Sequence, residues 1–285
     1  MQRRKLGKTD VELSIVGLGG CTLMNRPQEE VDRDVAFAVD SGINYFDVSP
    51  TYGNAEELLG PALEPYRKDA ILACKTHERQ AAGAQAELEN SLRVLRTDHF
   101  DLYQLHGLTS VDETAVALGP GGALETLLDA KQRGLTRWIG FSAHNEAAAI
   151  MCIETEQFDT VMMPLNHGSY EHGRFARMAV DQARRRGMGI LALKAMARQN
   201  IPKGQPRTHE GCWYRPEDDP HYAELLLRWT LSLPDVAAAV APGNPPLFRL
   251  AVEFASRYQP LDDAGLAELC EHYANVPPLF VTTES

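Results

Sequence analysis

The chain has 285 residues, a formal net charge of −11 and 44% hydrophobic residues, which is enough to fill a large core and argues against disorder. The acidic balance argues against nucleic acid as the main partner, because phosphate binding requires a basic face. Five cysteines without a CxxC pair favour reduced thiols in a cytoplasmic protein, and no stretch is long and apolar enough to span a membrane.

Hydrophobic periodicity and turn residues predict a β-hairpin over 2–16, with its turn at 7–10, followed by alternating strands and helices. The predicted strands are 15–20, 44–47, 70–75, 100–105, 136–141, 160–163, 189–193 and 236–240. The predicted helices are 29–41, 56–63, 84–95, 122–133, 146–154, 175–186, 221–233 and 246–258, with a last helix at about 262–273.

Eight strands that alternate with eight helices at this length predict a closed (β/α)8 TIM barrel, which we expect to occupy residues 1–285 as a single domain. The hairpin precedes the first barrel strand, so we expect it to close the barrel floor. The longest irregular stretch, 197–220, follows the seventh strand at the functional face. It is interpreted either as a lid or as a floppy insertion.

Four polar residues lie where successive strands end. Asp47, Lys75 and His106 follow the second, third and fourth strands, and Tyr52 lies just beyond the second. Each alone has an ordinary structural explanation, such as a helix cap, a surface charge or a core histidine. Because the ends of barrel strands converge on one mouth, the four in register favour a catalytic site.

The four residue types are chemically complementary. A tyrosine is a weak acid, with a reference pKa of about 10, and a nearby ammonium lowers that pKa by stabilising the phenolate. An aspartate keeps the lysine charged and in place. A neutral histidine can donate a hydrogen bond to a carbonyl oxygen. The set can therefore polarise and protonate a carbonyl group, while a nicotinamide cofactor is needed to deliver hydride.

The sequence resembles the aldo-keto reductases from Arg3 to about Tyr258. The segments that carry the resemblance are 5–9, 17–20, 45–60, 101–106, 137–142, 227–229 and 242–243. The resemblance implies a (β/α)8 barrel, a nicotinamide cofactor bound without a Rossmann domain, and reversible carbonyl reduction. It places the family's catalytic tetrad on Asp47, Tyr52 (the acid/base), Lys75 and His106.

Segments 107–110 and 119–124 are similar to a branch of the family whose members often carry a C-terminal iron–sulfur module. The cysteine cluster that such a module needs is missing from this sequence, so we expect no iron–sulfur cluster. A metal site is also not expected. His167, His172, His209 and Cys212 do not have the spacing of a standard zinc site.

The resemblance also implies cofactor contacts at the strand ends. Around the nicotinamide these are Gly20, Cys21, Asp47, Ser142, Ala143, Met162 and Leu193, and Lys194 is expected to meet the pyrophosphate. Three of them depart from the family pattern, because alanine, methionine and leucine stand where asparagine, glutamine and tyrosine are common. The adenosine end is expected on Pro242, Gly243, Asn244 and Arg249. Arg249 favours NADP(H), with NAD(H) as the alternative.

These observations predict an NADP(H)-dependent oxidoreductase that acts on a small-molecule aldehyde or ketone. Loop residues expected on the substrate side are His77, His144, His167, Trp213 and Tyr214. Two alternatives remain open: a cofactor-sensing binding protein with little or no turnover on the same fold, and a metal-dependent barrel hydrolase. Neither the physiological substrate nor the oligomeric state is predicted.

Overall fold

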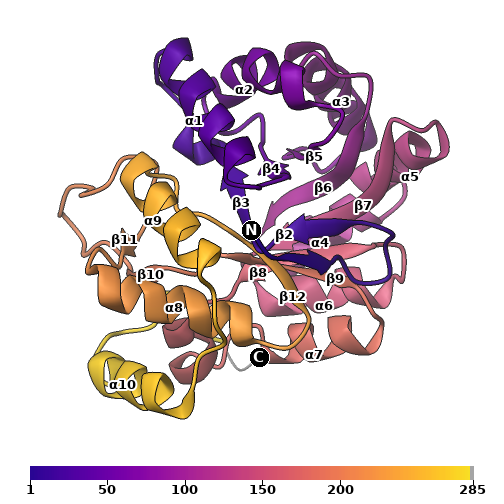
Figure 1. Cartoon of the computed structure of the whole chain (residues 1–285). Helices are drawn as coiled ribbons and strands as arrows, with labels where there is room; N and C mark the ends of the chain where they lie inside the picture. The colour runs from indigo at the N-terminus through magenta and orange to yellow at the C-terminus, as the bar shows by residue number, and fades with distance from the viewer. Residues whose placement is uncertain (283–285) are drawn as a thin grey trace.

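The computed structural model describes residues 1–282. Eight parallel strands close into a barrel in the order β12-β3-β4-β5-β6-β7-β8-β9, as predicted (Figure 1). They are β3 (Val16–Gly19), β4 (Tyr45–Asp47), β5 (Ile71–Thr76), β6 (Phe100–Leu108), β7 (Thr136–Ala143), β8 (Thr160–Pro164), β9 (Gly189–Leu193) and β12 (Val236–Val240).

The helices surround the strands (Figure 1). They are α1 (Gln28–Asp40), α2 (Ala55–Leu63), α3 (Ala81–Val94), α4 (Val111–Leu118), α5 (Ala123–Gln132), α6 (Glu146–Glu154), α7 (Arg177–Arg185), α8 (Pro220–Ser232), α9 (Pro245–Ser256) and α10 (Asp263–Tyr273). Most strands are buried along their whole length, because barrel side chains fill one face and helices cover the other.

The N-terminal hairpin closes one end of the barrel, as predicted. Strands β1 (Arg3–Lys5) and β2 (Glu12–Ser14) pair antiparallel, and the hairpin crosses the barrel end that faces the viewer in Figure 1. Leu6, Val11 and Leu13 belong to the apolar cluster inside the barrel. Gly7 has a φ of +55° and lies against the backbone of Gly189, so a side chain there would overlap the start of β9.

One helix was not predicted. Helix α4 lies in the connection between β6 and α5, for which the sequence analysis named no element. Its start is fixed by a capping box: the Ser110 hydroxyl accepts a hydrogen bond from the Glu113 backbone N–H, and the Glu113 carboxylate accepts one from the Ser110 N–H. The helix predicted at 175–186 begins later, at Arg177, and follows a π-helical turn over Gly168–His172.

The stretch 197–220 is an ordered cover rather than an open loop. Its two ends pair as β10 (Ala197–Gln199) and β11 (Arg215–Pro216). The Glu217 carboxylate, only 3% exposed, accepts hydrogen bonds from Arg198 at 2.8 Å and from Tyr273 of α10 at 2.5 Å. Cys212 and Tyr214 pack against the C-terminal tail. The segment is therefore fastened to the last helix and to the tail that follows it.

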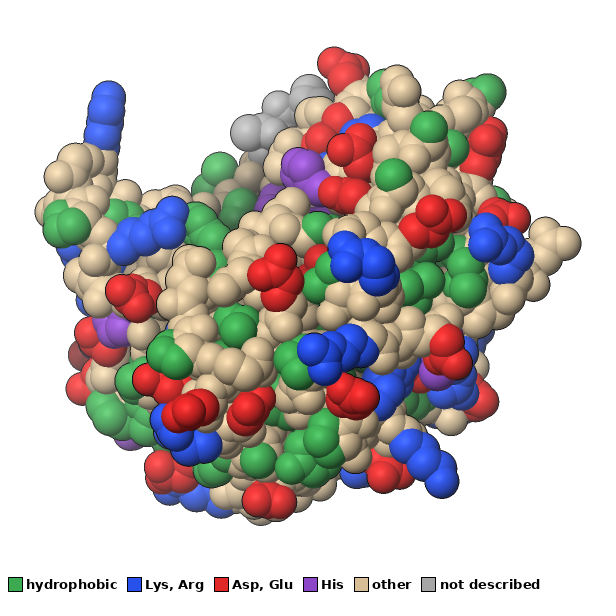
Figure 2. Space-filling view, turned by 90° about the horizontal axis from the view of Figure 1, so that it is seen from above, with side chains coloured by type: hydrophobic (Ala, Val, Ile, Leu, Met, Phe, Trp, Pro, Cys, Tyr) green, Lys and Arg blue, Asp and Glu red, His purple; other side chains and the backbone are tan. Residues whose placement is uncertain are grey.

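The face of the molecule shown in Figure 2 carries basic and acidic side chains interspersed, without one large field of either sign. Across residues 1–282, the helices are all too short or too polar to cross a lipid bilayer.

Candidate active site

The four residues predicted as catalytic lie around one cavity of about 280 Å³ at the carboxyl ends of the strands. Asp47 is the last residue of β4, and Tyr52 lies on the turn that follows. Lys75 lies near the end of β5 and His106 near the end of β6. Strand β5 pairs with both β4 and β6, so the adjacent strands bring these side chains to one side of the mouth.

Lys75 and Asp47 form a fully buried ion pair. The second carboxylate oxygen of Asp47 accepts hydrogen bonds from the Tyr45 hydroxyl at 3.1 Å and from the Gln104 amide at 3.3 Å. These contacts fix the carboxylate, and the carboxylate fixes the ammonium. The Lys75 Nζ lies 5.3 Å from the centre of the Tyr52 ring.

His106 bridges the tyrosine and the turn after β4. Its Nε2 lies 3.3 Å from the Tyr52 hydroxyl, and its Nδ1 lies 2.8 Å from the Ser49 hydroxyl. Burial, with a contribution from the Lys75 charge, holds the pKa of His106 well below its ordinary value of 6.5. The imidazole is therefore neutral near pH 7. If Ser49 donates to Nδ1, then Nε2 carries the proton and can donate into the cavity.

The expected lowering of the Tyr52 pKa is not found. Burial raises the pKa of Tyr52 well above 10, and the neighbouring Cys21 thiol and Asp47 carboxylate raise it further. The nearby Lys75 ammonium does not outweigh these effects. Tyr52 therefore holds its proton at neutral pH, which suits a group that donates a proton.

Several residues expected at the cofactor line the same cavity: Cys21, Asp47, Ser142, Leu193, Lys194 and Gly243. The Ser142 hydroxyl accepts a hydrogen bond from the Gly107 N–H at 2.7 Å, which fixes its orientation at the end of β7. Gly20 contributes through its small size. A Cβ there would lie 2.8 Å from Val48 and 3.2 Å from the Tyr52 ring, so glycine allows that ring its present place.

The other expected cofactor residues lie outside the cavity lining. Ala143 is buried at the end of β7, and Met162 points into the barrel interior. Pro242 and Asn244 precede α9, and the Asn244 side chain caps that helix. Arg249 pairs with the buried Asp34 and lies over the Phe37 ring at 4.4 Å.

The residues expected on the substrate side divide into two groups. His144, Trp213 and Tyr214 line the cavity, and the Trp213 ring lies 6.4 Å from the Tyr52 ring. His77 contacts His106, with ring centres 5.8 Å apart, but does not line the cavity. His167 is fully buried between Trp229 and Tyr273, away from the mouth.

Sequence reasoning did not single out some lining residues: Thr51, Gly211, Val240 and Ala241. Thr51 lies inside the recognised motif and could have been found there. Gly211 carries no signal in the sequence. The backbone of Gly211 lies so close to that of Gly243 that a side chain on Gly211 would overlap Gly243. This close approach lets the segment 197–220 lie against the chain that follows β12.

The histidines weighed as metal ligands do not form a site. The rings of His167 and His172 are 5.6 Å apart, while His209 and Cys212 lie in the covering segment. Over residues 1–282, His, Cys, Asp and Glu side chains do not gather in any group of three that could hold a metal ion.

Comparison with known proteins identifies the family. The model of the aldo/keto reductase family matches residues 15–244. The chain is 34% identical over 160 residues to the uncharacterized oxidoreductase YqkF of Bacillus subtilis, covering 50% of this chain and 49% of the relative. It is 33% identical over 159 residues to L-galactose dehydrogenase of Arabidopsis thaliana, covering 50% and 48%.

The aligned regions thus span about half the length of these two relatives. Among solved structures, the fold matches an aldo-keto reductase from Bacillus halodurans in its holo form, with a TM-score of 0.74 and 24% identity, covering 100% of this chain and 99% of that chain. Because the family model matches most of the sequence, the chain belongs to the aldo/keto reductase family.

Proposed function

We propose that this protein is an NADP(H)-dependent oxidoreductase that reversibly reduces a small aldehyde or ketone to an alcohol. The observation that carries the proposal is the convergence of Tyr52, His106, Lys75 and Asp47 on one cavity. Membership of the aldo/keto reductase family and the similarity to proteins named as an oxidoreductase and a dehydrogenase support it.

The residues that line the cavity support the binding of a nicotinamide ring. Gly19, Ala241 and Gly243 make one wall from residues with almost no side chain, and Leu193 supplies an apolar surface. Ser142 offers a fixed hydroxyl. The cofactor, in its reduced form, would supply a hydride to the carbonyl carbon. Ser142, Leu193 and Gly243 are the residues that would hold its nicotinamide end.

The protein's own groups act on the carbonyl oxygen. The Tyr52 hydroxyl and His106 Nε2 are 3.3 Å apart, so one substrate oxygen can accept hydrogen bonds from both. As a C–H bond forms at the carbon, the Tyr52 proton passes to the oxygen and forms the O–H bond of the alcohol. The phenolate that remains lies beside the Lys75 ammonium, and it regains its proton from solvent.

The preference for NADP(H) rests on Arg249. Its side chain is 48% exposed beside α1 and α9, where the adenosine end is expected. A guanidinium matches the geometry of a phosphate group. Asp34 is almost fully buried and also pairs with Arg26 at 2.6 Å, so it does not depend on Arg249 alone. Arg249 can therefore turn toward a phosphate without leaving Asp34 unpaired.

The test has two stages. Titrating the purified protein with NADPH and with NADH, followed by nicotinamide fluorescence, measures cofactor binding. Loss of nicotinamide absorbance with a panel of aldehydes, ketones and sugars then measures turnover. We expect binding of NADPH and turnover of at least one aldehyde. Tight binding with no turnover would point to a cofactor-sensing protein, and no binding of either cofactor would overturn the enzyme assignment.

A further inference from the structure

The catalytic cavity carries one uncompensated positive charge. Two lysines line it, Lys75 and Lys194. The charge of Lys75 is balanced by Asp47, but within residues 1–282 Lys194 has no carboxylate at salt-bridge distance. Asp47 is also the only carboxylate among the lining residues of this described part of the chain. In a protein with a net charge of −11, this cavity is therefore locally positive.

Lys194 is held in place by its backbone and by two side chains. It has a φ of +59°, which residues other than glycine seldom adopt and which often marks functional positions. Its Nζ lies 3.2 Å from Nε2 of His144 and 5.4 Å from the centre of the Phe280 ring. His144 and Phe280 stack on each other, with ring centres 5.6 Å apart.

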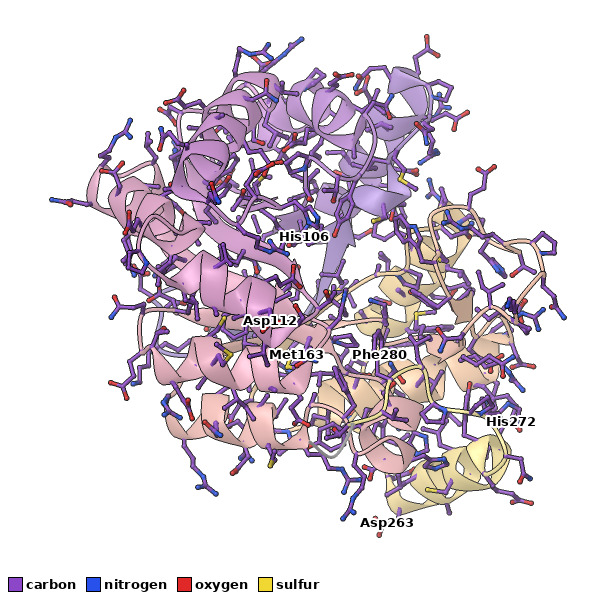
Figure 3. The ribbon with its side chains drawn as sticks, turned by 180° about the vertical axis from the view of Figure 1, so that it is seen from behind. His106, Asp112, Met163, Asp263, His272 and Phe280 are labelled. Atoms are coloured by element: carbon purple, nitrogen blue, oxygen red, sulfur yellow. The ribbon has the colours of Figure 1, made fainter. Side chains whose placement is uncertain are left out.

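Phe280 is brought to this position by the C-terminal tail. Figure 3 shows Phe280 near the middle of the molecule, while Asp263 and His272 mark helix α10 at the edge. The tail after α10 therefore runs back toward the barrel mouth. The ammonium of Lys194 is thus fixed between the end of β7, which carries His144, and this returning tail.

His144 orients the ammonium without neutralising it. Burial, together with the Lys194 charge, lowers the pKa of His144 to about 3, so its Nε2 accepts a hydrogen bond as a neutral group. Burial lowers the pKa of Lys194 to about 8, so the lysine is mostly charged at neutral pH. An anion beside Lys194 would offset that cost of burial.

The direction of the lysine indicates which anion it meets. Around the rim the strands run β7-β8-β9-β12, and Lys194 follows β9. It reaches toward His144 after β7, and β7 is the neighbour of β6, which carries His106. The adenosine end of the cofactor is expected in the opposite direction, beyond β12. Lys194 is therefore in contact with His144, which lines the cavity together with Trp213 and is expected on the substrate side.

We propose that Lys194, oriented by His144, is a subsite for an acidic group of the substrate, so that this enzyme prefers aldehydes or ketones that also carry a carboxylate or a phosphate. The proposal rests on the reductase function proposed above. His144 is a positioning residue here, and Lys194 is a residue that determines specificity.

The test compares two aldehydes that differ only in charge at the far end. In 4-oxobutanoate a carboxylate replaces the terminal methyl group of butanal. We expect wild-type kcat/KM to favour 4-oxobutanoate, and K194M to reduce that preference about tenfold or more, mainly through KM, because a charge-assisted hydrogen bond is lost. K194R should keep most of the preference. K203M, which removes an exposed lysine from the covering segment 197–220, should leave this preference unchanged.

The same variants separate a substrate acid from the cofactor phosphates that Lys194 was first expected to meet. The dissociation constant for NADPH, measured by fluorescence, is the second readout. Weaker NADPH binding in K194M with an unchanged ratio between the two aldehydes would assign the lysine to the pyrophosphate and overturn the proposal. Turnover of butanal with no wild-type preference for 4-oxobutanoate would refute the subsite alone, whereas turnover of no carbonyl compound would refute the reductase.

Discussion

The Lys75 ammonium lies 5.3 Å from the centre of the Tyr52 ring while it is paired with the buried carboxylate of Asp47. This arrangement assigns different tasks to the two states of the tyrosine. Before the reaction, burial keeps the phenol protonated. When the proton leaves, the ammonium is already in place to stabilise the phenolate, without any movement of the lysine.

The first prediction concerns Tyr52. Y52F removes the proton donor but keeps the ring that packs beside His106 and Trp213. We expect a melting temperature close to that of the wild type and a loss of turnover of about 10²-fold or more, as is usual when general acid catalysis is removed. Steady-state kinetics and thermal unfolding measure the two quantities. Near-normal turnover by Y52F would mean that another group protonates the oxygen.

The second prediction concerns the buried pair. K75M leaves Asp47 charged and unpaired in the interior, so we expect a loss of about 3–5 kcal/mol in the free energy of unfolding. The double variant K75M/D47N removes both charges and should recover part of that loss, although both variants should be catalytically impaired. Urea unfolding measures the difference. R96M, which breaks an exposed pair with Glu64, is the control and should cost less than about 1 kcal/mol.

Most of the barrel was predictable because its strands are short apolar runs that alternate with helical patterns. The run through Tyr45 and Phe46 ends at Asp47. The strand predicted over 44–47 is observed as β4, which also ends at Asp47. In a parallel barrel, the carboxyl ends of all strands lie at the same end, the mouth. This is why the sequence predicts that Asp47, Lys75 and His106 lie together.

The cover of the site was less predictable, because its contacts join segments that are far apart in the sequence. Gly211 meets Gly243, and Tyr273 of α10 donates a hydrogen bond to Glu217. No local period or turn signal encodes such contacts. The contact of Lys194 with His144, fifty residues away, could not be predicted for the same reason. Neither could the burial that raises the pKa of Tyr52.

Helix α4 is a different case, since its signal was present in the sequence. Ser110 and Glu113 have the spacing of a capping box, followed by apolar residues. The third prediction is that S110A lowers the free energy of unfolding by about 0.5–2 kcal/mol, the usual cost of losing an N-cap side chain. Urea unfolding at neutral pH checks it.

This cap is also expected to weaken in acid. Partial burial would raise the pKa of Glu113, but hydrogen bonds from Thr109 and the charge of Arg79 outweigh it and lower the pKa to about 2. A carboxyl group with a lowered pKa stabilises the fold above its unfolded value of 4.5, and this contribution is lost as the pH falls from 4.5 toward 2. E113Q should therefore show a smaller loss of stability than the wild type over that range.

The fourth prediction concerns cofactor choice. R249M should raise the dissociation constant for NADPH about tenfold or more and change that for NADH much less, because only NADPH carries a 2′-phosphate. Fluorescence titration of both cofactors measures the change. R257M, an exposed arginine at the end of the same helix, is the matched control. Equal weakening of both cofactors by R249M would show that the arginine holds the adenine or only supports the fold.

The last prediction follows from the lowered pKa of Lys194. Below a pH of about 8 the lysine is charged, and above it the lysine becomes neutral. KM for 4-oxobutanoate should therefore rise as the pH increases through about 8, because the attraction for its carboxylate is lost. KM for butanal should not follow this change. In K194R the rise should disappear, because a guanidinium stays charged throughout this range. If KM for both aldehydes rises in parallel, another group titrates and the ammonium does not select the acid.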